Sequence, residues 1–301
     1  MPRPDLASLG VGYRRIPLLA IGKDIYCDSR LIISKLESRY PGSNLTPPTA
    51  ADSGISKLFE NWTIDGGIFA NTVKLMPFWH DDGFLKNKAF LDDRQRLMGG
   101  RRMTAETMKA ARVGGLQHLR QAFDLLEGTF LADGREWILA TKEPSVADID
   151  AVWPFKWLTV DKGMRGSLPE DQFGEKNYPR VYAWVGRFME EVLRRKREGV
   201  VATALDGRTV FDRMVDAKSP VDAVPFQGKF AMGLNEGERV EVYPSDYGQM
   251  GKSSGILVGF TSDEVVLLNE QGLRLHFPLW NFTVRKAPEG AKADLKGKSK
   301  I

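Results

Sequence analysis

The spacing of the apolar residues changes twice along this chain, and this change constrains the fold more than any other feature of the sequence. Residues 16–40 have the pattern of a short hairpin followed by a helix, whereas residues 52–197 carry apolar residues at helical spacing. Between residues 240 and 284 the pattern becomes short alternating strands split by Gly and Asp turns. The sequence therefore predicts an α+β protein built from three different parts.

The borders of these parts follow the changes of pattern and the proline-containing joints between them. Leu45–Thr49 is such a joint, and Gly199–Gly233 has weak periodicity and two prolines. The expected organisation is a hairpin-and-helix part at 1–45, an all-helical domain at 46–200, a connecting segment at 201–233, a small β-barrel at 234–287 and a disordered basic tail at 288–301.

Charge and cysteine content exclude several classes of protein. The net charge of +4 is accounted for by residues 285–301, which hold six basic and two acidic residues, so the rest of the chain is balanced. This balance argues against a nucleic-acid or membrane partner. A single cysteine, Cys27, excludes an internal disulfide framework. With no apolar run of membrane-spanning length and no signal-like start, the expected location is the cytoplasm.

Two adjacent polar residues open the first helix. Asp28 and Ser29 follow the hairpin directly, at a helix N-terminus whose free N–H groups favour a carboxylate. Ser29 could hold that carboxylate while Asp28 binds an ammonium group, so the pair could recognise a zwitterion. The alternative is that one of the two only caps the helix.

A second pair of polar residues, Ser145 and Asp148, is predicted to stabilise the start of a helix. Ser145 and Asp148 have the spacing of a capping box at the start of a helix, in which each side chain binds the other residue's backbone N–H. The predicted role of Ser145 and Asp148 is therefore folding.

These features, in this order along the chain, resemble the glutathione S-transferase (GST) superfamily. The resemblance rests on Pro17 at the head of the hairpin, the Asp28–Ser29 pair, the Ser145 box and the aromatic helix at 178–184. It implies a partial thioredoxin-like domain, an all-α GST C-terminal-type helical domain and a cis Pro17. It also implies glutathione as co-substrate, bound by Ile16, Pro17, Asp28 and Ser29.

The sequence departs from the family at its start. The family's catalytic Tyr, Ser or Cys lies after a first strand, and no residue here matches that position, so the catalytic residue is unknown. We expect either a truncated sequence or a short form that pairs with a partner chain. Cys27, at the end of a strand, is expected to be an inert core residue.

The remaining candidates favour structural explanations. His80 with Asp81 and Asp82 lacks further ligands for a metal, so no metal site is expected.

The residues expected to line an apolar second-substrate pocket are Trp62, Phe69, Trp79, Trp153 and Trp157.

Two functions remain open from the sequence. The first is a transferase that conjugates glutathione to an electrophilic small molecule, with a homodimer as one expected assembly. The second is a noncatalytic binding or assembly protein that uses the helical domain and the β module for partner contacts. A third possibility, peptide recognition by the barrel, predicts that residues 234–287 fold alone.

Overall fold

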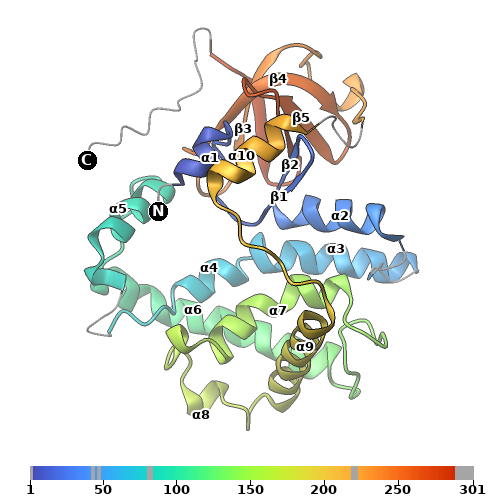
Figure 1. The fold of residues 1–301 in the computed structure, drawn as a ribbon. Coiled ribbons are helices and arrows are strands. Elements are labelled where there is room, and N and C mark those ends of the chain that lie inside the picture. The colour runs from blue at the N-terminus through green and yellow to red at the C-terminus, as the bar shows by residue number, and fades with distance from the viewer. Residues whose placement is uncertain (1–2, 42–44, 46–48, 80–83, 218–222, 289–301) are drawn as a thin grey trace. The chain divides into compact units, whose positions relative to one another are not determined.

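The computed structural model describes residues 3–41, 45, 49–79, 84–217 and 223–288 (Figure 1). The chain divides into two compact units, and each is assembled from segments that are distant in the sequence. The first unit takes its described residues from Met1–Arg39, Ala89–Arg102 and Thr203–Ile301. The second takes them from Tyr40–Lys88 and Met103–Ala202. All but the first residue of the expected tail at 288–301 lies outside the described residues.

The first unit is built around one seven-stranded sheet. Its strands are β1 (Leu18–Ile21), β2 (Asp24–Cys27), β3 (Arg239–Pro244), β4 (Ser253–Phe260), β5 (Glu264–Leu268), β6 (Arg274–Pro278) and β7 (Phe282–Lys286). Their order across the sheet is β1-β2-β6-β5-β4-β3-β7. The N-terminal hairpin and the five C-terminal strands, where the sequence predicted four or five, thus form a single sheet.

The predicted small β-barrel is wrong, because this sheet is open. β6 pairs with β5 on one edge and, in parallel, with β2 on the other, where Ile25 lies opposite Leu275. At the far end β7 pairs with β3. Alternating apolar residues predicted the strands correctly, but they carry no information about which strand takes up the second edge of β6.

Short helices accompany the sheet. They are α1 (Pro4–Ser8), α2 (Ser29–Arg39), α5 (Lys88–Leu97), α10 (Gly207–Asp216) and the turn η5 (Gly228–Phe230). α10 lies within the segment expected to be a connection; Asp206 caps its start, and Met214 is buried in the core of the sheet. α1 packs against α10 (Figure 1).

A buried network of charged groups joins the hairpin, α2 and the C-terminal strands. His276 on β6 is fully buried, with Nδ1 2.5 Å from Glu264 Oε1 and Nε2 3.0 Å from Asp24 Oδ1. Arg274 donates to both oxygens of Asp24, at 2.5 and 2.8 Å. Lys35 on α2 forms an ion pair with Glu264 at 2.7 Å. α2 is therefore tied to the C-terminal strands by the charge of Lys35 as well as by packing.

In its described residues the second unit is helical, and it leaves out residues 89–102 of the expected helical domain at 46–200, which belong to the first unit. Its elements are α3 (Ala50–Ile64), α4 (Ile68–Val73), η2 (Phe84–Lys86), α6 (Ala105–Leu125), η3 (Leu126–Phe130), α7 (Val146–Thr159), η4 (Lys162–Met164), α8 (Glu170–Phe173) and α9 (Pro179–Glu198). α3 packs on α7, and α4 packs on α6 (Figure 1). Phe123, Phe155 and Trp184 are fully buried at the centre of this unit. None of the helices in the described ranges is long and apolar enough to cross a membrane.

Candidate functional site

The hairpin register brings the two halves of the predicted glutathione site together. Leu18 on β1 lies opposite Cys27 on β2, so Pro17 and Asp28 leave the same end of the hairpin. The Ile16–Pro17 peptide bond is cis. Ile16 is 66% exposed, and Pro17 is exposed as well.

Asp28 occupies an unusual position at the start of α2. Its φ of +75° lies in the left-handed region, which costs energy for residues with a side chain but is tolerated best by Asn and Asp. Its Oδ1 accepts the Arg30 amide at 3.1 Å, and its Oδ2 accepts the Tyr13 hydroxyl at 3.2 Å. Backbone strain of this kind is often kept at functional sites.

The Asp28 carboxylate also lacks a cationic partner. Its residue is only 7% exposed, and within the ranges that the structure describes it forms no ion pair. A buried carboxylate without a counter-charge is costly, because neither water nor a cation compensates for its charge. Asp28 is thus suited to receive a cation from a ligand.

Ser29 is the first residue of α2 and is half-buried. No described residue forms a hydrogen bond with its hydroxyl. The first N–H groups of a helix lack carbonyl partners within the helix, and they carry partial positive charge. Ser29 and the helix start therefore offer donors to an anionic group, next to the anionic Asp28.

Neither Cys27 nor Tyr13 is activated at this site. Cys27 is fully buried, and its burial together with the neighbouring Asp28 raises the pKa of its thiol well above the usual range. Burial, followed by the charge of Asp28, also raises the pKa of Tyr13 far above its usual value. Both groups therefore stay protonated at neutral pH, and neither is a thiolate or a base there.

The sequence did not reveal that Tyr13 contacts Asp28. It lies four residues before Pro17 in a segment without regular structure, and its hydroxyl reaches Asp28 across the end of the hairpin. The aromatic residue close to Pro17 is the only signal in the sequence, and it gives no indication of which carboxylate it meets.

Ser145 and Asp148 meet at the start of α7. Asp148 Oδ2 accepts the Ser145 amide at 2.9 Å and the Ser145 hydroxyl at 2.7 Å. Asp148 Oδ1 accepts the Ile138 amide and Trp184 Nε1, both at 2.9 Å. The fully buried Asp148 thus fixes three segments of the helical unit, which is a structural role.

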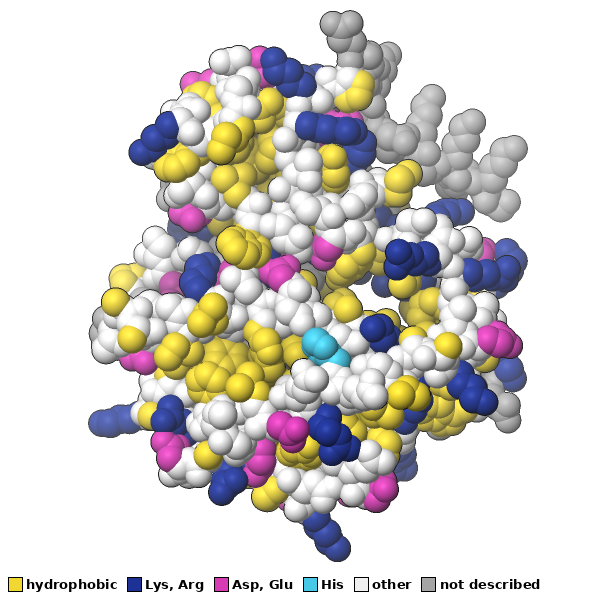
Figure 2. All heavy atoms as spheres, turned by 180° about the vertical axis from the view of Figure 1, so that it is seen from behind, with side chains coloured by type: hydrophobic (Ala, Val, Ile, Leu, Met, Phe, Trp, Pro, Cys, Tyr) yellow, Lys and Arg dark blue, Asp and Glu magenta, His cyan; other side chains and the backbone are white. Residues whose placement is uncertain are grey.

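The expected aromatic pocket does not form as one site. Trp62 lines an apolar groove of about 400 Å³ in the helical unit, between α3 and the end of α6, together with Phe59 and Phe130. Phe69 instead contacts Trp153 and Trp157, with ring centroids 5.1 and 6.3 Å apart. Hydrophobic side chains also gather on the surface of the molecule in Figure 2.

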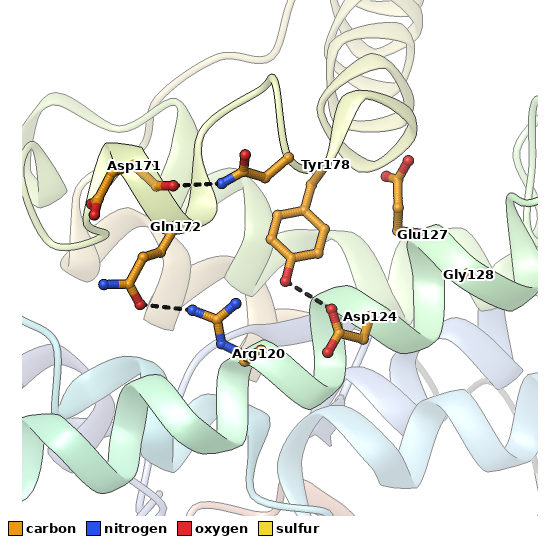
Figure 3. A pocket seen from close by; sticks show the side chains of 8 residues that line it. Arg120, Asp124, Glu127, Gly128, Asp171, Gln172 and Tyr178 are labelled. Carbon is orange, nitrogen blue, oxygen red and sulfur yellow. Dashed lines mark hydrogen bonds between the residues drawn. The ribbon is translucent and has the colours of Figure 1, made fainter.

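A polar pocket of about 480 Å³ lies between α6 and the start of α9 (Figure 3). Its groups are largely engaged with one another: the Tyr178 hydroxyl donates to Asp124 at 2.7 Å, and Arg120 donates to Gln172 at 2.7 Å. Burial, followed by the hydrogen bond to Asp124, raises the pKa of Tyr178 to about 12. These contacts stabilise the helical unit and give the pocket no activated group.

One group of possible metal ligands was considered from the sequence. His80, Asp81 and Asp82 lie outside the described residues. Among the residues that are described, no group of three or more His, Cys, Asp or Glu side chains could hold a metal ion.

Comparisons with known proteins match two parts of the chain to family models. Residues 1–44 match the glutathione S-transferase N-terminal domain family, and residues 71–197 match a domain of unknown function (DUF7962). The comparison with curated proteins finds no match.

Among solved structures, a GST-like protein from Pseudomonas syringae is 20% identical, with a TM-score of 0.61; the match covers 95% of this chain and 86% of that chain. A glutathione S-transferase from Rhodospirillum rubrum F11 is 18% identical over 63% of this chain and 72% of that chain, with a TM-score of 0.41. A glutathione transferase homologue from Sulfitobacter with bound glutathione is 11% identical over 66% of this chain and 96% of that chain, with a TM-score of 0.42. Residues 1–44 are thus similar to a glutathione S-transferase N-terminal domain, and the chain shares its fold with the GST-like protein from Pseudomonas syringae.

Proposed function

We propose that this protein binds glutathione at the end of the β1–β2 hairpin and conjugates it to an electrophilic small molecule. The observation that carries the proposal is the Asp28 carboxylate, which is buried beside the start of α2 and forms no ion pair with any described residue. The γ-glutamyl end of glutathione is a zwitterion. It brings an ammonium group for Asp28 and a carboxylate for Ser29 and the helix N-terminus.

The rest of the peptide would lie along the exposed segment at Ile16 and Pro17. Ile16 lies two residues before the start of β1, and its backbone can pair with the cysteinyl part of glutathione as a neighbouring strand does. Asp28, Ser29 and Ile16 thereby orient the thiol with respect to the hairpin. In conjugation the glutathione thiol gives its proton to solvent water, the thiolate sulfur forms the new bond to an electrophilic carbon, and the leaving group departs from that carbon with its electron pair.

Binding is tested by isothermal titration of glutathione into the protein and two variants. Ser29→Ala removes the hydroxyl that would hold the γ-glutamyl carboxylate, so its affinity is expected to fall about tenfold. Cys27→Ala alters the neighbouring buried residue, and its affinity is expected to stay the same. Equal binding by wild type and Ser29→Ala, or no binding by the wild type, would refute the proposed site.

A second function is favoured by one specific observation. The raised pKa values of Tyr13 and Cys27 leave both groups protonated at neutral pH, so neither supplies the base or cation that thiolate formation needs. The chain could then be a noncatalytic protein that binds glutathione and assembles with a partner. A conjugation assay with an aryl halide distinguishes the two: turnover supports the transferase, whereas binding without turnover supports the second function.

A further inference from the structure

Tyr13 is held in place by the C-terminal strands. Its ring lies 6.1 Å from that of Phe277 on β6 and 5.7 Å from that of Phe282 on β7, measured between ring centroids. Only 2% of the residue is exposed. A side chain packed in this way has little rotational freedom, so the position of its hydroxyl is set by the surrounding core.

The backbone at Tyr13 is fixed by the same part of the protein. The amides of Gly12 and Tyr13 both donate to Ser253 Oγ on β4, at 3.1 and 3.2 Å. Gly12 also passes so close to Lys252 that a Cβ atom would lie 1.7 Å from the Lys252 carbonyl oxygen. The C-terminal strands thus determine both the main chain and the ring of Tyr13.

The Tyr13 hydroxyl in turn orients Asp28. It donates to Oδ2 while the Arg30 amide donates to Oδ1, so the two bonds fix the plane of the carboxylate. Each carboxylate oxygen can accept a further hydrogen bond beyond the one it receives here. The remaining acceptor directions are therefore held constant before any ligand arrives, which lowers the cost of binding.

We propose that Tyr13 is a positioning residue that gives the site its preference for ligands with a free α-ammonium group, by aiming the Asp28 carboxylate at that group. This inference rests on the proposed glutathione site. It assigns to the C-terminal strands, which hold Tyr13, a role in ligand specificity.

The test combines one substitution with one change in the ligand. Tyr13→Phe keeps the ring and removes the hydroxyl, and glutathione is compared by titration calorimetry with its analogue lacking the α-amino group. Tyr13→Phe is expected to bind glutathione about fivefold to tenfold more weakly than the wild type. The two proteins are expected to bind the desamino analogue equally, because that ligand makes no use of Asp28.

Tyr178→Phe is the matched control. It removes a buried tyrosine hydroxyl that donates to an aspartate, Asp124, in the helical unit, and it should leave the affinity for both ligands unchanged. If Tyr13→Phe does not fold, Ser253→Ala takes its place. It loosens the anchor of Tyr13 while keeping the phenol, and the same selective loss is expected.

The outcomes separate the inference from the function on which it rests. Equal weakening for both ligands would show that Tyr13 only supports the fold, and unchanged affinity for both would show that its hydroxyl is not needed. Either result overturns the inference while the glutathione site stands. A wild type that binds neither ligand overturns the proposed function, and the inference with it.

Discussion

Asp28 combines two unfavourable features that a residue with a purely structural task would avoid. Its backbone has a φ of +75°, and its buried carboxylate has no cationic partner among the described residues. A glycine would remove the first cost, and an asparagine would remove the second while still accepting the Arg30 amide. Retaining an aspartate here is consistent with a task that needs the negative charge.

Two substitutions separate the strain from the hydrogen bonds. Asp28→Ala and Asp28→Gly both lose the acceptors for the Arg30 amide and the Tyr13 hydroxyl. Only glycine adopts the positive φ without a steric penalty, so Asp28→Gly is expected to be more stable than Asp28→Ala by about 1 kcal/mol. Urea denaturation measures this difference. Equal stability, or a less stable Asp28→Gly, would contradict the assigned strain.

At this scale the sequence predicts part of the site. Asp28 and Ser29 could be selected because a polar pair at a helix start has a known chemistry. Tyr13 could not, because its contact with Asp28 depends on an anchor at Ser253, 240 residues away in the chain. Local patterns do not encode contacts between segments so far apart.

The element that delivers Tyr13 to the site is a segment without helix or strand. It is held along the C-terminal strands by hydrogen bonds to Gly12 and Tyr13, and by Asn269 Nδ2, which donates to the Leu9 carbonyl at 2.7 Å. Arg15 continues this attachment through contacts with Asp246 and Tyr247. The segment therefore depends on close backbone contact rather than on its own secondary structure.

Gly12→Ala tests that close contact. The added methyl group would overlap the Lys252 carbonyl, so unfolding free energy should fall by about 2 kcal/mol. Gly54→Ala in α3 is the control: a Cβ at Gly54 meets nothing within 4 Å, and alanine should be neutral or slightly stabilising in a helix. Thermal unfolding of the two variants checks this. A neutral Gly12→Ala would show that the segment is not tightly held.

The network around His276 predicts a loss of stability in acid. Burial would raise the pKa of Glu264, but the hydrogen bonds from His276 and Lys35 outweigh it and hold the pKa below its ordinary value of 4.5. Since this pKa is lower in the folded state, Glu264 stabilises the protein above about pH 4.5, and that contribution is lost as the pH falls.

Glu264→Gln should therefore reduce stability at neutral pH and flatten the fall of stability in acid. Glu270→Gln, on an exposed turn, should change neither. Denaturation across the acid range provides the measurement. A variant that retains the full acid dependence of the wild type would exclude Glu264 as its source.

At the scale of the whole molecule, the sheet unit is assembled from segments at both ends of the chain. β2 from the N-terminal hairpin covers one edge of β6, and Asp24 supplies one of the two carboxylates that hold the buried His276. The period-two pattern predicts the strands of this unit, but pairing partners are decided by edges and buried charges. This is why the sequence favoured a separate barrel where the protein has a shared, open sheet.

A fragment of residues 234–287 tests that arrangement. Without β2 it would expose the edge of β6 and leave His276 without Asp24, so we expect no cooperative thermal unfolding transition by circular dichroism. The full chain should unfold cooperatively under the same conditions. A sharp unfolding transition of the fragment would instead show that residues 234–287 fold independently of the hairpin.

The central claim is that the charge of Asp28 binds the ammonium group of glutathione, and Asp28→Asn tests it most directly. Asparagine tolerates the left-handed backbone and still accepts the Arg30 amide, so only the charge and one acceptor oxygen are lost. Isothermal titration at neutral pH should show an affinity for glutathione lower by about tenfold, or ~1.4 kcal/mol. Equal affinity of Asp28→Asn and wild type would contradict the account.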